Sequence, residues 1–245
     1  MANNDRTALI EVERLTRIYG EDGAGTAALD DVTLTIGRGE FVAIMGPSGS
    51  GKSTLLHLLG LLDRPTAGTY RLGGTIVTDF TDAELARFRN HMIGFVFQAF
   101  NLLPRLTVFQ NIIVPLLYSD VPESSWNKRA EHVIQKVGLT HRAHHEAATL
   151  SGGEKQRAAI ARALIMNPEV IFADEPTGNL DSRSGETIME TIRDLHETLG
   201  RTIVLVTHES YAASYARRVI TLHDGKIVRD EPNAHRPRKG DGYQK

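Results

Sequence analysis

The segment Gly46-Pro-Ser-Gly-Ser-Gly-Lys52-Ser53 directly follows the apolar run Phe41-Val-Ala-Ile-Met45. It fits the pattern G-x-x-x-x-G-K-[ST], whose glycines let backbone N–H groups turn inward around phosphate oxygens. Residues 53–62 predict a helix, and its N-terminus would offer unpaired N–H groups to the same anion. Lys52 would add a mobile charge for the β and γ phosphates, and the Ser53 hydroxyl suits Mg²⁺. The pattern predicts a phosphate cradle, and its place between a strand and a helix argues against a chance match.

Strand-like and helix-like runs alternate through most of the chain, which is typical of an α/β fold with a largely parallel sheet. Short apolar runs predict further buried strands at residues 170–173, 203–206 and 219–222. Residues 184–199 repeat apolar side chains at helical spacing. The first forty residues differ, because they alternate apolar and polar side chains. They predict two antiparallel strands, at residues 9–15 and 32–36, joined by a glycine-rich loop at residues 20–25.

One domain over residues 8–231 accounts for this organisation. Within it, residues 90–166 are mostly helical in pattern, with a strand at residues 93–97, and we interpret them as an inserted helical subdomain. Residues 232–245 are polar and rich in proline, glycine and basic side chains, and they predict a disordered tail.

Two carboxylates, Asp174 and Glu175, follow the predicted strand at residues 170–173. Ligands of open α/β sheets bind outside the carboxyl ends of the strands, so both side chains are expected near the cradle. An aspartate there would hold the Mg²⁺ shell, and Glu175 would be the general base that polarises the attacking water. The alternative is an acidic loop start that caps the turn Pro176-Thr-Gly178. The cradle favours the catalytic interpretation.

A second glycine motif, Leu150-Ser-Gly-Gly-Glu154, precedes an alanine-rich run at residues 155–166. Ser151 and Glu154 fit the S-x-x-E capping box of a helix N-terminus, which is a purely structural explanation. Capping alone does not call for Gly152 and Gly153, because glycine is a poor helix former in the first turn. The two glycines are explained if a phosphate must approach the backbone closely at this point.

The second motif, followed by Lys-Gln-Arg157, resembles the signature motif of ABC ATPases. The resemblance covers about residues 9–231. It implies a P-loop NTPase with a RecA-like, mainly parallel core, an N-terminal antiparallel β subdomain and an inserted α-helical subdomain.

Other family marks stand in the expected order. By this resemblance Tyr19 would stack on adenine, Gln98 would touch Mg²⁺ or water, and His208 would contact the γ-phosphate. Taken singly, a tyrosine such as Tyr19 is more often a packed edge aromatic, and a histidine such as His208 is usually a polar surface or core residue. The resemblance implies catalytic roles for Lys52, Glu175 and His208, and metal ligands in Ser53, Gln98 and Asp174. The nucleotide-binding residues so implied are Tyr19, Gly46, Pro47, Ser48, Gly49, Ser50, Gly51, Lys52, Ser53, Thr54, Gln98, Ser151, Gly152, Gly153 and Asp181.

The commonest signature motif ends in glutamine, whereas this sequence has Glu154 at that position. A helix dipole favours a carboxylate in the first turn, but the added charge lies near a phosphate site. A signature that ends in glutamate resembles that of the lipoprotein-releasing and cell-division ABC ATPases. We therefore expect ATPase activity to be retained. Leu62-Asp-Arg-Pro65 and Pro176-Thr-Gly-Asn-Leu-Asp181 are also similar to the lipoprotein-releasing and macrolide-efflux subgroup.

The resemblance implies a head-to-tail dimer in which each ATP, with Mg²⁺, lies between one copy's cradle and the other copy's signature. ATP binding and hydrolysis would then close and reopen the dimer and drive a transmembrane permease subunit. The segment at residues 99–113, which carries Leu103, is either internal packing of the helical insertion or a groove for a helix of that permease. The implied location is cytoplasmic, peripheral on the inner face of the membrane.

Composition argues against several kinds of site and function. The 245 residues contain no cysteine and carry a net charge of −2, which argues against thiolate metal sites and non-specific nucleic-acid binding. The polar start predicts no secretory signal, and no apolar run approaches the roughly 18 residues that span a bilayer. A soluble ABC ATPase of the cluster-assembly type remains the alternative function. The set of Lys52, Asp174, Glu175 and His208 argues against a non-catalytic nucleotide-binding module.

Overall fold

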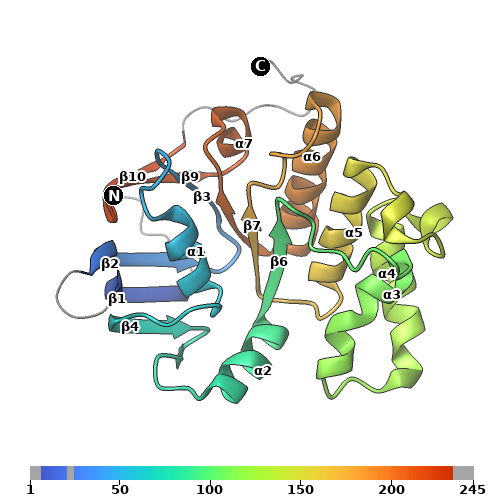
Figure 1. Cartoon of the computed structure of the whole chain (residues 1–245), viewed down its shortest axis with the longest axis horizontal. Helices are drawn as coiled ribbons and strands as arrows, with labels where there is room; N and C mark the ends of the chain where they lie inside the picture. Colours follow the sequence, from blue (N-terminus) through green and yellow to red (C-terminus); the bar gives the residue numbers. More distant parts are fainter. Residues whose placement is uncertain (1–6, 21–24, 234–245) are drawn as a thin grey trace.

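The structure, a computed structural model, describes residues 7–20 and 25–233 (Figure 1). A six-stranded sheet lies at its centre, an antiparallel sheet covers one side, and most helices lie on the other side. The predicted loop at residues 20–25 falls mostly outside the described residues. So does the predicted tail, apart from Pro232 and Asn233, of which Pro232 ends the last strand.

The six-stranded sheet has the order β10-β9-β3-β8-β7-β6. Its strands are β3 (Phe41–Met45), β6 (Ile93–Phe97), β7 (Val170–Asp174), β8 (Thr202–Val206), β9 (Arg218–His223) and β10 (Lys226–Pro232). All neighbours pair in parallel except β10, which is antiparallel to β9. Strands buried on both faces need near-continuous apolar sequence, and the first four residues of β3 are fully buried. The five strands predicted for this sheet are confirmed.

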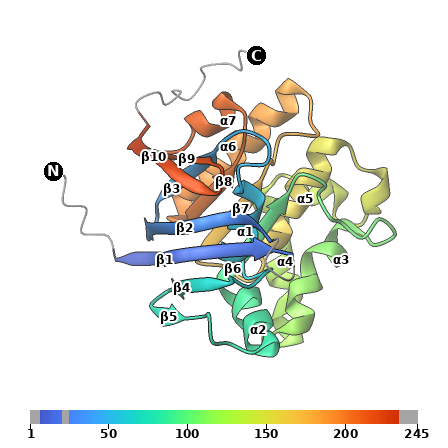
Figure 2. The same ribbon diagram turned by 60° about the vertical axis from the view of Figure 1, so that its left-hand side comes forward.

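The second sheet is antiparallel, with the order β2-β1-β4-β5. It contains β1 (Ala8–Tyr19), β2 (Thr26–Gly37), β4 (Ala67–Leu72) and β5 (Thr75–Ile76). The alternating pattern of the first forty residues correctly predicts β1 and β2, which bury one face of each strand and expose the other. Figure 2 shows this sheet beside the central one, with α1 behind it.

The helices are α1 (Lys52–Leu59), α2 (Asp82–Met92), α3 (Val108–Ile113), α4 (Trp126–Lys136), α5 (Gly152–Leu164), α6 (Ser182–Leu199) and α7 (Ser210–Ser214), with short 3-10 turns η1 (Val114–Tyr118), η2 (Glu123–Ser125), η3 (Thr140–Arg142) and η4 (Ala147–Thr149). The core divides into two clusters, one on each face of the central sheet. Side chains of α1 join the cluster of the antiparallel sheet, whereas α5 and α6 join the other. The cradle helix and the signature helix therefore pack on opposite faces.

Helix boundaries differ slightly from the predictions. The first helix ends at Leu59 instead of residue 62, because Gly60 packs against Phe95 and Leu61 adopts the left-handed conformation (φ 57°). A Cβ on Gly60 would lie 2.4 Å from the Phe95 ring. Helix α5 begins at Gly152, three residues before the predicted start, because Ser151 is its N-cap.

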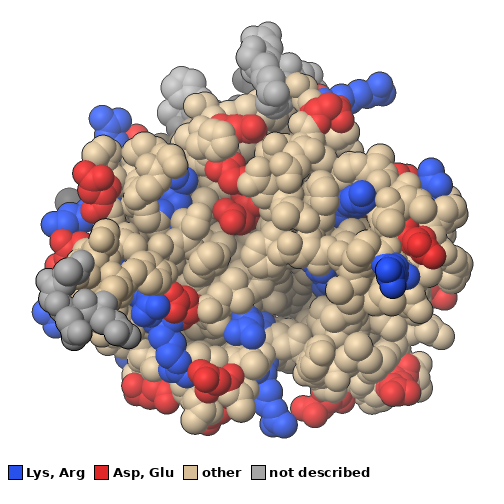
Figure 3. Space-filling view, viewed as in Figure 1, with Lys and Arg blue, Asp and Glu red and all other residues tan. Residues whose placement is uncertain are grey.

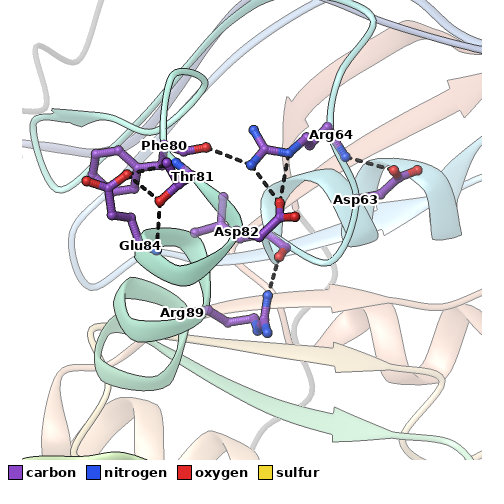
Figure 4. A network of polar contacts seen from close by, with 8 residues as sticks. Asp63, Arg64, Phe80, Thr81, Asp82, Glu84 and Arg89 are labelled. Atoms are coloured by element: carbon purple, nitrogen blue, oxygen red, sulfur yellow. Dashed lines mark hydrogen bonds and ion pairs between the residues drawn. The ribbon is translucent and has the colours of Figure 1, made fainter.

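Helix α2 is fixed against the turn that follows α1 by the polar network of Figure 4. Thr81 and Glu84 form a capping box at its N-terminus. Arg64 reaches from the turn to the carboxylate of Asp82 (2.8 Å) and the carbonyl of Phe80, and Arg89 donates to the Leu61 carbonyl. These contacts set the position of one wall of the groove described below. No helix within the described ranges is long and apolar enough to cross a membrane.

Candidate functional site

Four adjacent strands bring the predicted catalytic groups to one edge of the central sheet. The order β3-β8-β7-β6 places the phosphate cradle, His208, the pair Asp174–Glu175 and Gln98 after successive parallel strands. The carboxyl ends of parallel strands share one edge, which is where α/β sheets bind ligands. Residues that are far apart along the chain, from Gly46 to His208, thus meet at a single site.

The cradle has the backbone shape that its glycines predict. Gly51 is left-handed (φ 98°), and a Cβ on it would lie 2.4 Å from the Ala28 carbonyl oxygen. A Cβ on Gly46 would lie 2.3 Å from the Leu222 carbonyl oxygen. Gly49 has no such neighbour within 4 Å and is exposed, so the loop is open where a phosphate would enter. The Ser50 hydroxyl is buried and has no hydrogen-bond partner among the described residues.

Lys52 lies across the loop, and its Nζ donates to the carbonyls of Gly46 (2.9 Å) and Pro47 (2.8 Å). These bonds hold the ammonium group beside the cradle, where it can exchange a carbonyl for a phosphate oxygen. Ser53 is exposed and Thr54 half-buried on the first turn of α1. The donor set fits an anion, because a lysine and free helical N–H groups converge on it.

Glu175 and His208 are in direct contact. His208 Nδ1 lies 2.7 Å from Glu175 Oε1, and the same oxygen accepts the His208 backbone N–H at 3.0 Å. The second oxygen, Oε2, accepts from the Thr207 hydroxyl at 3.1 Å. Glu175 itself has φ 43°, an uncommon conformation for a side chain of this size, and its N–H bonds to the end of β8. The carboxylate is therefore oriented by three contacts from the loop after β8.

Asp174 is half-buried at the end of β7. Burial, with the neighbouring Glu175 carboxylate, raises the pKa of Asp174, and His57 and Lys52 lower it. A cation would offset the repulsion between the two acids. Hydroxyl, amide and carboxylate oxygens from Ser53, Gln98 and Asp174 are the hard ligands that Mg²⁺ prefers, so these residues fit the metal.

Gln98 is tied to the loop after β7. Its Nε2 lies 3.3 Å from Asn179 Oδ1, and Asn179 Nδ2 donates to the Gln98 carbonyl at 3.0 Å. Gly178 allows this approach, because a Cβ there would lie 2.6 Å from Gln98 Nε2. Asp181 caps α6 by accepting from the Ser184 N–H, so its role in this structure is local.

The signature residues lie on the other face of the sheet from the cradle helix. The capping box is present: Glu154 N–H donates to the Ser151 hydroxyl, and Glu154 Oε2 accepts the Ser151 N–H at 2.9 Å. The structure is therefore compatible with both helix capping and phosphate binding. The cap leaves the N–H groups of Gly152 and Gly153 in the first turn without intrahelical partners.

Tyr19 ends β1 with its side chain 43% exposed. Its hydroxyl donates to Asp63 Oδ2 at 2.9 Å, and the guanidinium of Arg17 lies 4.5 Å from the ring centroid. Asp63 also pairs with Arg17 at 2.9 Å. The ring is therefore held at its hydroxyl edge by Asp63 and on one face by Arg17.

Several residues of the site were not found from the sequence. Gln156 is fully buried and donates to the carbonyls of Pro176 (2.7 Å) and Phe97 (3.3 Å). Arg162 donates to the Phe100 carbonyl at 2.8 Å and to Asn101, both left-handed residues after Gln98. The two side chains connect α5 to the loops after β6 and β7. Polar residues on an otherwise alanine-rich helix were the available indication.

A groove of about 1380 Å³ opens between α2, β6 and η1. Figure 3 shows a hollow in this region, on a face where acidic and basic side chains are interspersed. Its lining includes the exposed apolar residues Leu117 (59%) and Tyr118 (73%), and also Arg162 and Asn101. From the segment at residues 99–113, Asn101 lines the groove, whereas Leu103 is 50% exposed on the neighbouring loop.

Known proteins resemble this chain over most of its length. Residues 29–178 match the family model described as ABC transporter. The chain is 51% identical over 222 residues to a macrolide export ATP-binding/permease protein, MacB, of Chlorobaculum tepidum, covering 91% of this chain and 34% of that protein. It is 47% identical to the lipoprotein-releasing system ATP-binding protein LolD of Geobacter metallireducens, covering 91% of this chain and 100% of that protein. The chain thus spans about a third of the MacB relative.

Solved structures agree. A dimeric bacterial ABC transporter cassette superposes with a TM-score of 0.83 at 43% identity, covering 91% of this chain and 98% of that one. A dimeric post-hydrolysis state of an ATP-binding cassette, bound to ADP and Pi, has the same TM-score at 42% identity. The predicted fold class and family are confirmed, including the similarity to the lipoprotein-release and macrolide-export proteins. The chain belongs to the ABC transporter family of ATP-binding cassettes.

Proposed function

We propose that this chain is the ATP-hydrolysing subunit of an ABC transporter, in which two copies bind two ATP molecules and drive a transmembrane permease. The observation that carries the proposal is the shared edge of β3, β8, β7 and β6, which gathers a phosphate cradle, Glu175, His208 and Gln98. That set supplies phosphate binding, a base and a polar contact for the attacking water, which is what ATP hydrolysis requires.

Different residues of the site have different roles in ATP hydrolysis. The cradle and Lys52 bind and orient the β and γ phosphates. Glu175, oriented by Thr207 and His208, accepts a proton from the attacking water. His208 is 68% exposed, so it can leave Glu175 and contact the γ-phosphate. Ser53, Gln98 and Asp174 would hold Mg²⁺, whose charge would stabilise the transferring phosphoryl group.

A second copy completes the site in this proposal. The central sheet separates the signature helix α5 from the cradle helix α1 of the same chain. The N-terminal turn of α5 nevertheless has the free N–H groups of an anion site. A head-to-tail partner would present that turn to the nucleotide, with Asp181 and its loop at the interface. The dimeric cassettes among the similar structures support a dimer.

The permease is proposed to dock in the groove between α2 and η1. An amphipathic helix laid in a groove buries apolar anchors such as Leu117 and Tyr118, which are otherwise exposed. Arg162 and Asn101 both line this groove and are hydrogen-bonded to each other, and Asn101 lies on the loop that follows Gln98. Docking would thereby reach the nucleotide site, and the chain would lie on the inner face of the membrane through its permease. Lipoprotein release or efflux is the transport class that the relatives' names favour.

Charge substitutions test this assignment. Leu103→Glu and Leu117→Glu should keep the ATP turnover of the isolated protein and lose its stimulation by the permease that co-purifies from native membranes. Val228→Glu is the matched control, since Val228 is 56% exposed on β10, a strand at the opposite edge of the central sheet. Equal loss of basal and stimulated turnover, or stimulation that survives both changes, would count against docking here. If no membrane protein co-purifies with the chain from native membranes, the soluble cluster-assembly type would be favoured.

A further inference from the structure

The glutamate that replaces the usual signature glutamine is fully engaged by its surroundings. Glu154 Oε2 accepts the N–H and the hydroxyl of Ser151, both at 2.9 Å. The other oxygen, Oε1, accepts from Arg142 Nε at 2.9 Å, and His141 Nε2 lies 4.0 Å away. Arg142 comes from η3, the turn between α4 and η4, so a neighbouring element supplies the cation.

The arrangement divides the carboxylate between two tasks. One oxygen caps the helix as a signature glutamine would, through its single acceptor oxygen. The second oxygen is the part that glutamine does not have, and Arg142 is its partner. The side chain of Glu154 is 14% exposed, whereas that of Arg142 is 39% exposed, so the pair is only partly screened by water. These contacts lower the pKa of Glu154 to about 2, chiefly through the Ser151 N–H.

A carboxylate in this position would otherwise oppose the nucleotide. The proposed function places a γ-phosphate against the N-terminal turn of α5, next to Ser151. Two like charges a few ångströms apart repel, and the repulsion is stronger where a closed interface excludes water. The Ser151 hydroxyl also donates to Glu154, so it must turn from the carboxylate to reach a phosphate oxygen.

We propose that Arg142 is a positioning residue for the signature motif, which makes a glutamate workable there. By holding Glu154 Oε1, Arg142 keeps the carboxylate turned back on its own helix and offsets its charge. The first-turn N–H groups of α5 then remain available to a phosphate bound in the cradle of a second copy. The proposal rests on the composite nucleotide site of the proposed function. It adds that Arg142 is required with Glu154 and dispensable with glutamine.

A double-mutant cycle tests the dependence of one residue on the other. All variants carry Glu175→Gln, so that ATP is retained, and the affinity of the ATP-driven dimer is measured by sedimentation with Mg²⁺ and ATP. Arg142→Gln should weaken the dimer about tenfold or more when Glu154 is present. In the Glu154→Gln background the same change should alter the affinity less than twofold. Arg142→Lys keeps the charge, so its dimer affinity should lie between that of Arg142→Gln and that of the protein with Arg142 intact.

Further readouts separate positioning from structural support. Arg142→Gln should leave the affinity of the monomer for ATP unchanged, because the cradle is intact, and its defect in dimerisation should shrink at high salt. Arg38→Gln is the matched control, since Arg38 forms a surface ion pair with Glu169 at 2.6 Å, away from both glycine motifs. It should have no effect on the dimer. Thermal melting of each variant identifies any that fails to fold.

The outcomes are distinct. If the Glu175→Gln protein does not dimerise with ATP at all, the proposed function fails before Arg142 is at issue. If it dimerises, and Arg142→Gln weakens the dimer equally with Glu154 in place and in the Glu154→Gln background, or weakens it in neither, the role of Arg142 is refuted. Rescue of Arg142→Gln by Glu154→Gln supports it.

Discussion

Asn111 offers a sharp test of how the loop beside the groove is held. It is fully buried in α3 and forms four hydrogen bonds with the loop that precedes the helix. Its Oδ1 accepts the Leu103 N–H at 2.7 Å, and its Nδ2 lies 3.0–3.2 Å from the carbonyls of Leu103, Leu106 and Thr107. One side chain therefore sets the conformation of the segment that exposes Leu103.

The cost of removing it follows from those bonds. A neutral hydrogen bond contributes about 0.5–1.5 kcal/mol net, so Asn111→Ala should lose about 2–4 kcal/mol when some carbonyls regain water. For a chain of this size that corresponds to a melting temperature lower by roughly 5–15 °C. Asn111→Asp should cost at least as much, because its carboxylate would face three carbonyl oxygens in a buried site.

The assay is thermal unfolding followed by circular dichroism, with permease-stimulated ATP turnover measured on the folded protein. Stimulation should fall with the loss of loop structure. Asn127→Ala, an exposed asparagine on α4, serves as the control and should melt as the unmodified protein does. An Asn111→Ala protein that melts within about 1–2 °C of the control would refute the argument.

Four further changes have defined outcomes. Glu175→Gln should bind ATP normally and turn over about 10²–10⁴-fold more slowly, as single-turnover kinetics would measure. Gly51→Ala should abolish ATP binding by equilibrium titration, since its Cβ would meet a carbonyl oxygen at 2.4 Å. Tyr19→Phe, which keeps the ring but loses the bond to Asp63, should weaken ATP binding more than binding of inorganic triphosphate. Glu154→Gln should flatten the pH dependence of stability between about pH 4.5 and 2, because the lowered pKa of Glu154 stabilises the fold above that window and the contribution is lost as pH falls through it.

Local pattern was enough to predict the strands that carry the candidate site, whereas β4, β5 and β10 were not predicted from it. The run at residues 41–45, the glycine loop and the following helix form one continuous unit, so their order in the sequence is their order in space. The strands ending at Asp174 and Val206 were also predicted from their continuous apolar runs, because a parallel sheet buries both faces of its strands. The alternating pattern of β1 and β2 correctly indicated one buried face and one exposed face.

Contacts between side chains of different loops could not be predicted from the sequence. The pair Glu175–His208, the exchange between Gln98 and Asn179, and the pair Arg142–Glu154 depend on sheet order and on side-chain rotamers. Hydrogen bonds of this kind join loops up to 81 residues apart, and no periodicity encodes them. The capping box did predict one half of the Glu154 geometry, whereas its partner on η3 could not be anticipated.

The central claim is that one copy's signature loop completes the other copy's nucleotide site. The most direct test is the solution mass of Glu175→Gln with Mg²⁺ and ATP, beside the double variant Glu175→Gln/Gly152→Asp. Asp suits the first helical turn, so α5 should persist, but its charge faces the phosphate. We expect both proteins to bind ATP, and only the first to double its mass from 27.0 kDa. Equal dimerisation of the two, or a monomeric Glu175→Gln protein with ATP bound, would contradict the account.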